Sequence, residues 1–219
     1  MRSQRKSFLF YRFSRKLVEI FFRLFYRMKV YGEKEHFFKG NAIIAGNHVS
    51  YFDPPFVGVA WPEVIHYFAR DTLFDQPVLG FLLRSYNVHP LSSKTATGAI
   101  KLVSELLDQD LKVVIFPEGT RSERDEIIDP KPGFAMIAQK TNSPVIPVYV
   151  HGAYDIWNRY RKWPKLSGRL VCVFGSPIFL DQFKDLSKKE AQNALMDAWV
   201  ESIEHLKKWY LDGAKGTPP

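Results

Sequence analysis

Residues 42–54 read Ala42-Ile43-Ile44-Ala45-Gly46-Asn47-His48-Val49-Ser50-Tyr51-Phe52-Asp53-Pro54, and this stretch predicts a buried strand, a loop and the start of a helix. The apolar run 42–45 ends at a glycine, which is typical of a buried strand that enters a turn. Asp53 is a residue type that caps helices, and Pro54 suits the first helical position because its missing N–H costs nothing there. His48 is therefore expected in the loop.

An imidazole and a carboxylate five positions apart form the first candidate site. In an ideal helix this offset turns two side chains about 140° apart, but a loop that enters a helix can fold His48 back onto Asp53. Such a pair supplies a general base, because the carboxylate fixes the tautomer and stabilises the imidazolium after proton abstraction. The alternative is a capping or solvent-exposed pair with no chemical role.

A second predicted strand, 112–116, runs into the polar loop Pro117-Glu118-Gly119-Thr120-Arg121-Ser122. Gly119 lets the backbone approach a ligand closely, and Arg121 offers a fixed fork of donors that suits a phosphate or a carboxylate. An ordinary turn, with Glu118 and Arg121 in a surface ion pair, is the other interpretation. Both loops follow predicted strands, so both are candidates for one site.

Together and in this order, the two loops resemble the glycerolipid acyltransferase family. The family's first motif, Asn-His with an Asp after four intervening residues, is matched by Asn47, His48 and Asp53. Its third motif, Phe-Pro-Glu-Gly-Thr-Arg-Ser, is present in full as residues 116–122, and the strand 145–148 with its central proline matches the fourth. Three motifs in family order and spacing make coincidence hard to sustain.

The family's second motif is where this chain departs. Many members carry an Ile-Pro-Val-Asp-Arg-like stretch, whereas this chain reads His89-Pro90-Leu91-Ser92-Ser93. The usual arginine is missing, and Lys94 is the candidate that would replace it in phosphate binding. Residues 131–133, Lys-Pro-Gly, resemble the segment that usually precedes the fourth motif. The resemblance extends over residues 30–180.

The resemblance implies an α/β fold, a single acyltransferase domain with a mixed sheet flanked by helices. It implies direct transfer of a fatty acyl group from an acyl thioester to the free sn-2 hydroxyl of 1-acyl-sn-glycerol-3-phosphate, a lysophosphatidate, which gives phosphatidic acid. His48 would take the hydroxyl proton and Asp53 would hold the imidazole. The residues implied at the acceptor's glycerol phosphate are Glu118, Gly119, Thr120 and Arg121, with Lys94 as a further candidate.

The resemblance implies no metal and no cofactor, and acyl-CoA or acyl-carrier protein would be the co-substrate. The sequence itself contains no His, Cys and carboxylate spacing that is typical of a metal site. Its single cysteine, Cys172, is predicted to be an inert core thiol. Two alternatives stay open: an acyltransferase for another lysolipid or for glycerol-3-phosphate, and a catalytically silent membrane-binding protein that retained the fold.

The basic charge belongs to one end of the chain. Residues 1–30 hold nine lysines and arginines against the single acidic residue Glu19, a difference that equals the whole chain's formal net charge of +8. Apolar residues recur at helical spacing opposite the basic ones, which predicts an amphipathic helix or a pair of helices. No apolar stretch reaches the ~18 residues that a membrane crossing requires, and signal-peptide features are missing.

A basic amphipathic helix with aromatic residues suits the interface of an anionic membrane. We therefore expect a peripheral, monotopic protein at the cytoplasmic face of the cell membrane, with anionic phospholipids as partners. The alternative is a terminal helix that packs on the domain with its basic face in solvent. Nucleic acid is not expected as a partner, because residues 31–219 are neutral overall and lack an RNA- or DNA-binding signature.

The rest of the chain alternates between strands and helices, as α/β domains do. The predicted strands are 29–32, 41–45, 64–69, 112–116, 145–150 and 170–174. The predicted helices are 55–60, 77–85, 95–107, 133–140 and a last helix from a Ser187/Glu190 capping box to Gly213. The aromatic and basic run 154–164 is either a second interfacial patch or a surface loop. The predicted division is a membrane-interface segment 1–30, an acyltransferase domain 31–213 and a flexible tail 214–219.

Overall fold

The computed structural model describes residues 2–34, 36–91 and 96–219. Within these residues the strands are β1 (Lys29–Tyr31), β2 (Ala42–Gly46), β3 (Ile65–Arg70), β4 (Val88–Leu91), β5 (Lys112–Ile115), β6 (Val145–His151) and β7 (Val171–Phe174). The α-helices are α1 (Arg2–Tyr26), α2 (Asp53–Ala60), α3 (Pro77–Ser85), α4 (Ala96–Leu107), α5 (Pro132–Thr141), α6 (Ala153–Trp157) and α7 (Lys188–Leu211). Short 3₁₀ turns occupy Asp71–Asp75 and Leu180–Phe183.

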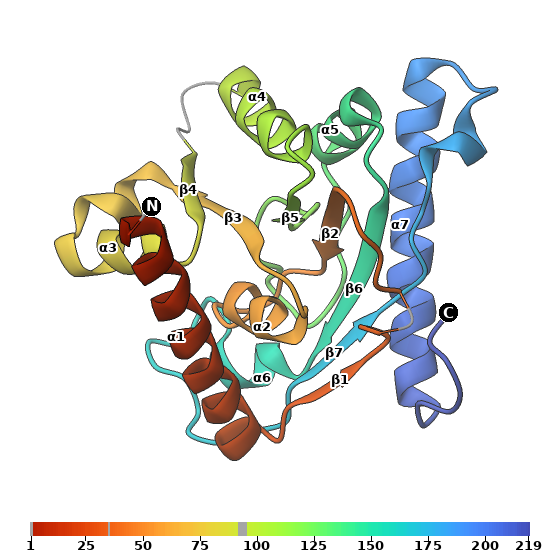
Figure 1. Ribbon diagram of the computed structural model, residues 1–219. Helices are drawn as coiled ribbons and strands as arrows, with labels where there is room; N and C mark the ends of the chain where they lie inside the picture. Colours follow the sequence, from red (N-terminus) through yellow and green to blue (C-terminus); the bar gives the residue numbers. More distant parts are fainter. Residues whose placement is uncertain (1, 35, 92–95) are drawn as a thin grey trace.

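The strands form one mixed sheet in the order β1-β7-β6-β2-β5-β3-β4 (Figure 1). Neighbouring strands run parallel, except that β6 and β7 are antiparallel. The predicted α/β fold with a mixed sheet flanked by helices is thus confirmed. The central strands β5, β2 and β6 are parallel to one another, so their carboxyl ends meet at one edge of the sheet.

Besides the two 3₁₀ turns, one strand and one α-helix of the described residues were not predicted. Strand β4 contains Pro90, which cannot donate to a strand ladder, and the structure places β4 at the edge of the sheet, where a proline is tolerated. Helix α6 has five residues, too few for a helical period to emerge from the sequence. The predicted strands and helices are all present with boundaries shifted by up to two residues, which is the usual uncertainty at element ends.

Both faces of the sheet are covered, and each has its own apolar core. Along β2 the side chains alternate: Ile44 packs into the core beneath α1, α2 and α6, while Ile43 packs into the core beneath α4, α5 and α7. Figure 1 shows these two helical layers on opposite sides of the sheet. A strand that is buried on both faces is a continuous apolar run, and this explains why residues 42–45 are so clear in the sequence.

Helix α1 is a single helix that lies along α2 and is partly built into the domain (Figure 1). Phe22 and Tyr26 belong to the core and are 1% and 2% exposed. The guanidinium of Arg15 donates to carbonyls at the end of α2, with its Nε 3.2 Å from the oxygen of Gly58. The predicted amphipathic helix is confirmed. One side of it packs on the domain, as in the alternative of a terminal helix that packs on the domain.

The other side of α1 remains apolar and exposed. Phe13, Leu17, Leu24 and Phe25 are 66%, 51%, 73% and 50% exposed. Nevertheless, none of the helices in the described part of the chain combines the length and the hydropathy that a bilayer crossing requires. The membrane-interface role of residues 1–30 therefore stays a prediction.

The C-terminal helix α7 begins as predicted. The side chain of Ser187 accepts a hydrogen bond from the Glu190 amide, and the Glu190 carboxylate accepts one from the Ser187 amide at 3.0 Å, which is a capping box. After α7 the chain turns back along the body. The indole N–H of Trp209 donates to the Lys215 carbonyl at 3.0 Å, and the Ser176 amide donates to the Pro219 carbonyl at 3.0 Å.

Candidate active site

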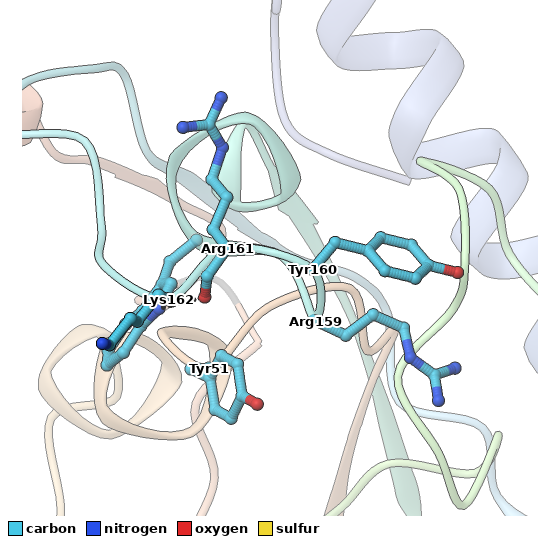
Figure 2. Close-up of a pocket in the computed structure, with 6 residues that line it drawn as sticks. Tyr51, Arg159, Tyr160, Arg161 and Lys162 are labelled. Carbon is cyan, nitrogen blue, oxygen red and sulfur yellow. Dashed lines mark hydrogen bonds between the residues drawn. The ribbon is translucent and has the colours of Figure 1, made fainter.

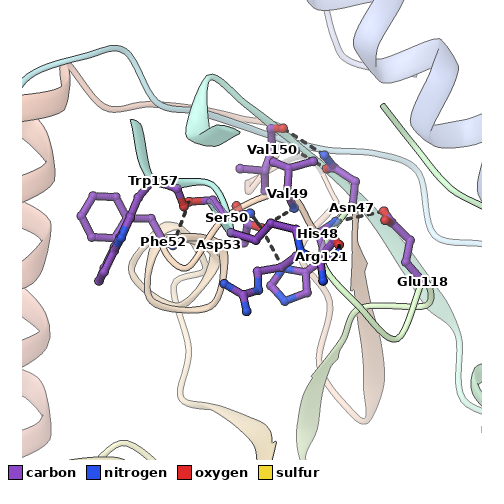
Figure 3. Close-up of polar contacts among 11 residues, drawn as sticks. Asn47, His48, Val49, Ser50, Phe52, Asp53, Glu118, Arg121, Val150 and Trp157 are labelled. Carbon is purple, nitrogen blue, oxygen red and sulfur yellow. Dashed lines mark hydrogen bonds and ion pairs between the residues drawn. The ribbon is translucent and has the colours of Figure 1, made fainter. Parts of the chain in front are cut away.

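Two loops meet at the carboxyl edge of the parallel strands. One follows β2 and carries His48, and the other follows β5 and carries residues 116–122. The amide of His48 donates to Glu118 Oε1 at 2.9 Å, and the amide of Ser122 donates to the His48 carbonyl at 2.7 Å. Figure 3 shows this contact between the loops. In parallel sheets this edge is where ligands bind, because loops from several strands converge there.

Asn47 fixes the start of the first loop to a third strand, β6. Its side-chain NH₂ donates to the carbonyl of Val150 at 3.1 Å, and its side-chain oxygen accepts from the amide of Val150 at 2.7 Å. The asparagine is 2% exposed, so these bonds are sheltered from water. The side chain thus continues the pairing between β2 and β6 beyond the end of β2, and it holds the next residue, His48, in place.

The structure brings His48 and Asp53 together as predicted. His48 Nδ1 lies 2.8 Å from Asp53 Oδ2, and the same oxygen accepts the amides of Val49 and Ser50 at 2.7 Å each. Asp53 is 0% exposed. Because an ionised carboxylate only accepts hydrogen bonds, Nδ1 carries the proton of the neutral imidazole and Nε2 keeps the free lone pair.

The predicted helix cap is wrong by one residue. Asp53 is the first residue of α2, and the cap position belongs to Phe52, with φ −82° and ψ −14° and no side-chain cap bond. The reason is competition: the Asp53 carboxylate is engaged by the imidazole and by two loop amides, which lie before the helix. Pro54 is therefore the second residue of α2 and not the first, as had been predicted, but it still lies in the first turn.

The ring of His48 is held by an aromatic neighbour. It stacks on Phe116 with 4.2 Å between ring centroids and 22° between planes. The His48 side chain is 17% exposed, while its partner Asp53 is fully buried. The imidazole therefore presents only a limited part of its surface outward, and both its position and its tautomer are constrained before any substrate arrives.

Glu118 is 0% exposed, and its contact is with the His48 backbone. Burial raises the pKa of Glu118 to about 8, and the nearby Asp53 carboxylate adds to this, while hydrogen bonds from backbone amides lower it. The carboxyl group is thus mostly protonated at neutral pH. Among the described residues no ion pair joins Glu118 to Arg121, so the predicted alternative of a surface ion pair is wrong.

The rest of the second loop is more open. Gly119 has a left-handed φ of 68°, and a side chain at this position would come within 3.0 Å of the Lys131 side chain. Thr120 is exposed, and Arg121 is half-buried. The Nη1 atom of Arg121 is buried and donates to no acceptor within the described ranges. Lys94 lies outside the described residues.

Several residues of this region were not identified from the sequence. The ring of Tyr51 lies 3.6 Å from the guanidinium carbon of Arg121, a cation–π contact. The carbonyl of Trp157 accepts the Ser50 hydroxyl at 2.8 Å and the Tyr51 amide at 3.2 Å. Tyr51 lies inside the first motif and could have been noticed, but Trp157 is more than a hundred positions away and no sequence signal links it to the loop.

The sequence predicted neither a metal site nor a reactive thiol. Within residues 2–34, 36–91 and 96–219, no group of three His, Cys, Asp or Glu side chains could hold a metal ion. Cys172 lies in β7 at 0% exposure, and burial raises the pKa of its thiol. The prediction of an inert core thiol is confirmed, because a buried protonated thiol is a poor nucleophile.

Comparisons with known proteins point to one kind of chemistry. The family described as Acyltransferase matches residues 27–151. A protein from Bacillus subtilis (strain 168) named 1-acyl-sn-glycerol-3-phosphate acyltransferase is 27% identical over 199 residues, which cover 90% of this chain and 96% of that protein. A protein of the same name from Cocos nucifera is 25% identical over 184 residues, 82% of this chain, but the chain spans only 56% of its length.

A solved structure is similar over nearly the whole chain. The crystal structure of the 1-acyl-sn-glycerophosphate (LPA) acyltransferase PlsC from Thermotoga maritima has a TM-score of 0.77 and 25% sequence identity. The match covers 94% of this chain and 84% of that one.

Proposed function

The chain belongs to the Acyltransferase family, and on that premise we propose that it transfers a fatty acyl group from an acyl thioester to the free sn-2 hydroxyl of 1-acyl-sn-glycerol-3-phosphate. The product is phosphatidic acid, so the protein is an O-acyltransferase of phospholipid synthesis. The names of the similar proteins from B. subtilis and T. maritima support this acceptor. The observation that carries the proposal is the contact between His48 and the buried Asp53 at the carboxyl edge of the sheet.

In the proposed reaction, His48 acts as the general base. Its Nε2 removes the proton of the sn-2 hydroxyl while that oxygen attacks the thioester carbonyl carbon. Asp53 stabilises the resulting imidazolium through the 2.8 Å contact at Nδ1. The tetrahedral intermediate then expels the thiolate, which takes up the proton, and the new ester remains on the acceptor. No covalent acyl-enzyme, metal or cofactor is part of this scheme.

We assign the acceptor's phosphate to Arg121. Its buried Nη1 has no acceptor in the described structure, and its guanidinium carbon lies 3.6 Å from the centre of the Tyr51 ring, which restricts the guanidinium. A guanidinium that is oriented in advance loses less conformational entropy when it binds a phosphate. Gly119 and Thr120 complete this open part of the loop. Lys94 stays a prediction as a further phosphate ligand.

Glu118 has a different position in the scheme from the one that the resemblance implied. Because it is fully buried and accepts the His48 amide, we propose that it acts as a positioning residue for the catalytic loop. Its raised pKa of about 8 fits a neutral carboxyl that serves as a hydrogen-bond acceptor.

The lipid acceptor also requires access to a membrane. We propose that the exposed apolar face of α1, with Phe13 and Leu24 at 66% and 73% exposure, lies in the interface of an anionic bilayer. The protein would then be peripheral, at the cytoplasmic face of the cell membrane. The acyl donor would be acyl-CoA or acyl-carrier protein, which reach the site from the aqueous side.

The test is a transfer assay with purified full-length protein, radiolabelled acyl-CoA or acyl-carrier protein, and a panel of acceptors. Transfer to lysophosphatidate above all other acceptors is expected, and His48→Ala should abolish it. His205→Ala is the matched control, because His205 lies on α7 with its side chain 59% exposed. Preference for another lysolipid or for glycerol-3-phosphate, which the altered second motif leaves open, would replace the proposed acceptor. Absence of transfer to every acceptor would favour a silent membrane-binding protein.

A further inference from the structure

A second surface of the molecule combines exposed aromatic and basic residues. Residues 159–166, called here the 159–166 loop, read Arg-Tyr-Arg-Lys-Trp-Pro-Lys-Leu and contain four cationic residues and no acidic one. Tyr160, Trp163 and Leu166 are 66%, 73% and 84% exposed. Large apolar side chains that stand in water among cations are typical of proteins that insert into the interface of an anionic membrane.

The 159–166 loop is held in place by hydrogen bonds. The Trp157 indole donates to the Arg161 carbonyl at 3.2 Å, and the Lys165 amide donates to the Ile156 carbonyl at 3.0 Å. The Tyr26 hydroxyl, at the end of α1, donates to the Lys165 carbonyl at 2.8 Å. The loop therefore presents its apolar side chains from a fixed backbone, and ordering them on a membrane costs less entropy than ordering a free segment.

The loop also continues the apolar surface of α1. The amide of Gly168 donates to the carbonyl of Phe25 at 3.3 Å, so the chain just after the loop lies against the end of that helix. At this end Leu24 and Phe25 are 73% and 50% exposed. Two segments more than 130 positions apart thus form one neighbourhood of exposed apolar groups.

A basic pocket opens within the 159–166 loop. It has a volume of about 470 Å³ and is lined by Tyr51, Trp157, Arg159, Tyr160, Arg161 and Lys162 (Figure 2). Tyr51 is shared with the candidate active site, because Arg121 stacks on the same ring. Arg159 donates to the Arg121 carbonyl at 3.1 Å and lies 3.5 Å from the Glu123 carboxylate. The pocket is therefore the immediate neighbour of the proposed acceptor site.

We propose that the 159–166 loop is a second membrane contact, with Trp163 and Leu166 inserted in the interface and a phosphate headgroup of an anionic lipid in the basic pocket. Charge complementarity selects an anionic bilayer as the occupant, since the loop carries only positive charge. Together with α1 the loop would hold the His48 site against the bilayer from two sides. Vesicle binding tests this contact directly, so the proposal does not depend on the proposed acyl transfer.

The first test is co-sedimentation of the full chain with phosphatidylcholine vesicles and with vesicles that also contain phosphatidylglycerol. Since each basic residue near an anionic surface contributes about fivefold, the loss of two cations alone should weaken binding to the anionic vesicles roughly 25-fold. Arg161→Glu/Lys162→Glu also adds two negative charges and should therefore weaken binding by at least this factor. Lys188→Glu/Lys189→Glu, an equal charge change at exposed positions of α7, is the control and should weaken binding much less. Trp163→Ala/Leu166→Ala should weaken binding to both kinds of vesicle, whereas Leu211→Ala should not.

Fluorescence quenching by brominated lipids tests independently whether Trp163 inserts into the membrane. Of the five tryptophans, Trp61 and Trp199 are fully buried, whereas Trp163 is 73% exposed. Quenching in the full-length protein should be strong and should largely disappear in Trp163→Phe. Wild-type quenching in Trp163→Phe, or unchanged sedimentation of both loop variants, would overturn the proposal. An increased KM for soluble acyl-CoA in Arg161→Glu/Lys162→Glu, with unchanged vesicle binding, would assign the pocket to the donor's phosphates instead.

Discussion

The surroundings of the His48 loop and the exposed surface of α1 both depend on ionisable residues, but they hold these residues in opposite environments. Beside the His48 loop, Asp53 at the start of α2 and Glu118 in the second loop are both 0% exposed, and both accept hydrogen bonds from backbone amides of the His48 loop. On α1, Leu24 is 73% exposed, and basic residues stand in water beside it. A buried group that loses its partner leaves an unsatisfied charge, so the loop should respond strongly to single changes. Single substitutions on the exposed surface of α1 should each have a small effect, and the effects of several substitutions should add.

The largest effect is expected from His48→Ala. Removing a general base commonly lowers kcat by ~10² to 10⁴. The fold should remain intact, because the backbone hydrogen bonds that join His48 to Glu118 and Ser122 persist in this variant. Steady-state kinetics together with thermal unfolding separate the two effects. Near-wild-type turnover in a folded His48→Ala protein would exclude the base assignment.

A smaller and more selective effect is expected from Arg121→Ala. Loss of a charge-assisted hydrogen bond costs about 1.5 to 3 kcal/mol, or roughly 10- to 100-fold in kcat/KM for a phosphate-bearing acceptor. Arg121→Lys should recover only part of this, because an ammonium cannot form the bidentate contact. The measurement is acceptor and donor kinetics in parallel. A change confined to the donor's KM would place Arg121 on the thioester side.

Glu118→Gln should change the pH dependence of stability more than it changes turnover. The pKa of Glu118 is raised from 4.5 to about 8, so the folded protein keeps a proton that the unfolded chain has lost between these values. The stability of the wild type therefore falls as pH rises through this window, relative to Glu118→Gln. Urea unfolding at several pH values measures the difference. A constant difference from pH 5 to pH 9 would contradict the raised pKa.

The smallest effects are expected from substitutions on the exposed side of α1. Because the other side of α1 is part of the core, these effects should be measured with substitutions and not with a truncation. Deleting residues 1–30 would remove Phe22 and Tyr26 from the core, so a truncated chain would report on folding. Phe13→Ser and Leu24→Ser change exposed positions instead. Each should weaken vesicle binding several-fold and leave transfer to detergent-dispersed acceptor nearly unchanged, since about 1.5 to 3 kcal/mol is the most that one buried apolar side chain contributes. Equal losses in both assays would indicate a folding defect.

The contrast between the two regions also explains what the sequence could predict. The strands beneath the site are buried on both faces, so residues 42–45 and 112–115 are apolar runs that any hydropathy pattern reveals. The pairing of His48 with Asp53 was predicted because the two residues lie five positions apart, at the two ends of one loop. Strand β4 was missed because its four residues include His89 and Pro90 and none of the four is buried, so the strand does not form an apolar run in the sequence.

Contacts between distant segments could not be predicted. Glu118 was expected at the acceptor, and only the fold shows that its carboxyl is buried against the His48 amide, 70 positions away. The same is true of Trp157, whose carbonyl holds Ser50 from 107 positions away. On α1 the helical period was clear, but the period does not distinguish Phe22, which enters the core, from Leu24, which stays exposed. Packing partners, rather than local pattern, decide these cases.

The central claim is that His48 and Asp53 act as one unit, and a double-mutant cycle on turnover tests it most directly. The four proteins are the wild type, His48→Ala, Asp53→Asn and the double variant, all assayed with lysophosphatidate and the same acyl thioester. If Asp53 acts only through the imidazole, the double variant should be as slow as His48→Ala alone, although Asp53→Asn is itself strongly impaired. Rate losses that multiply in the double variant would show that the two residues act independently and would contradict the account.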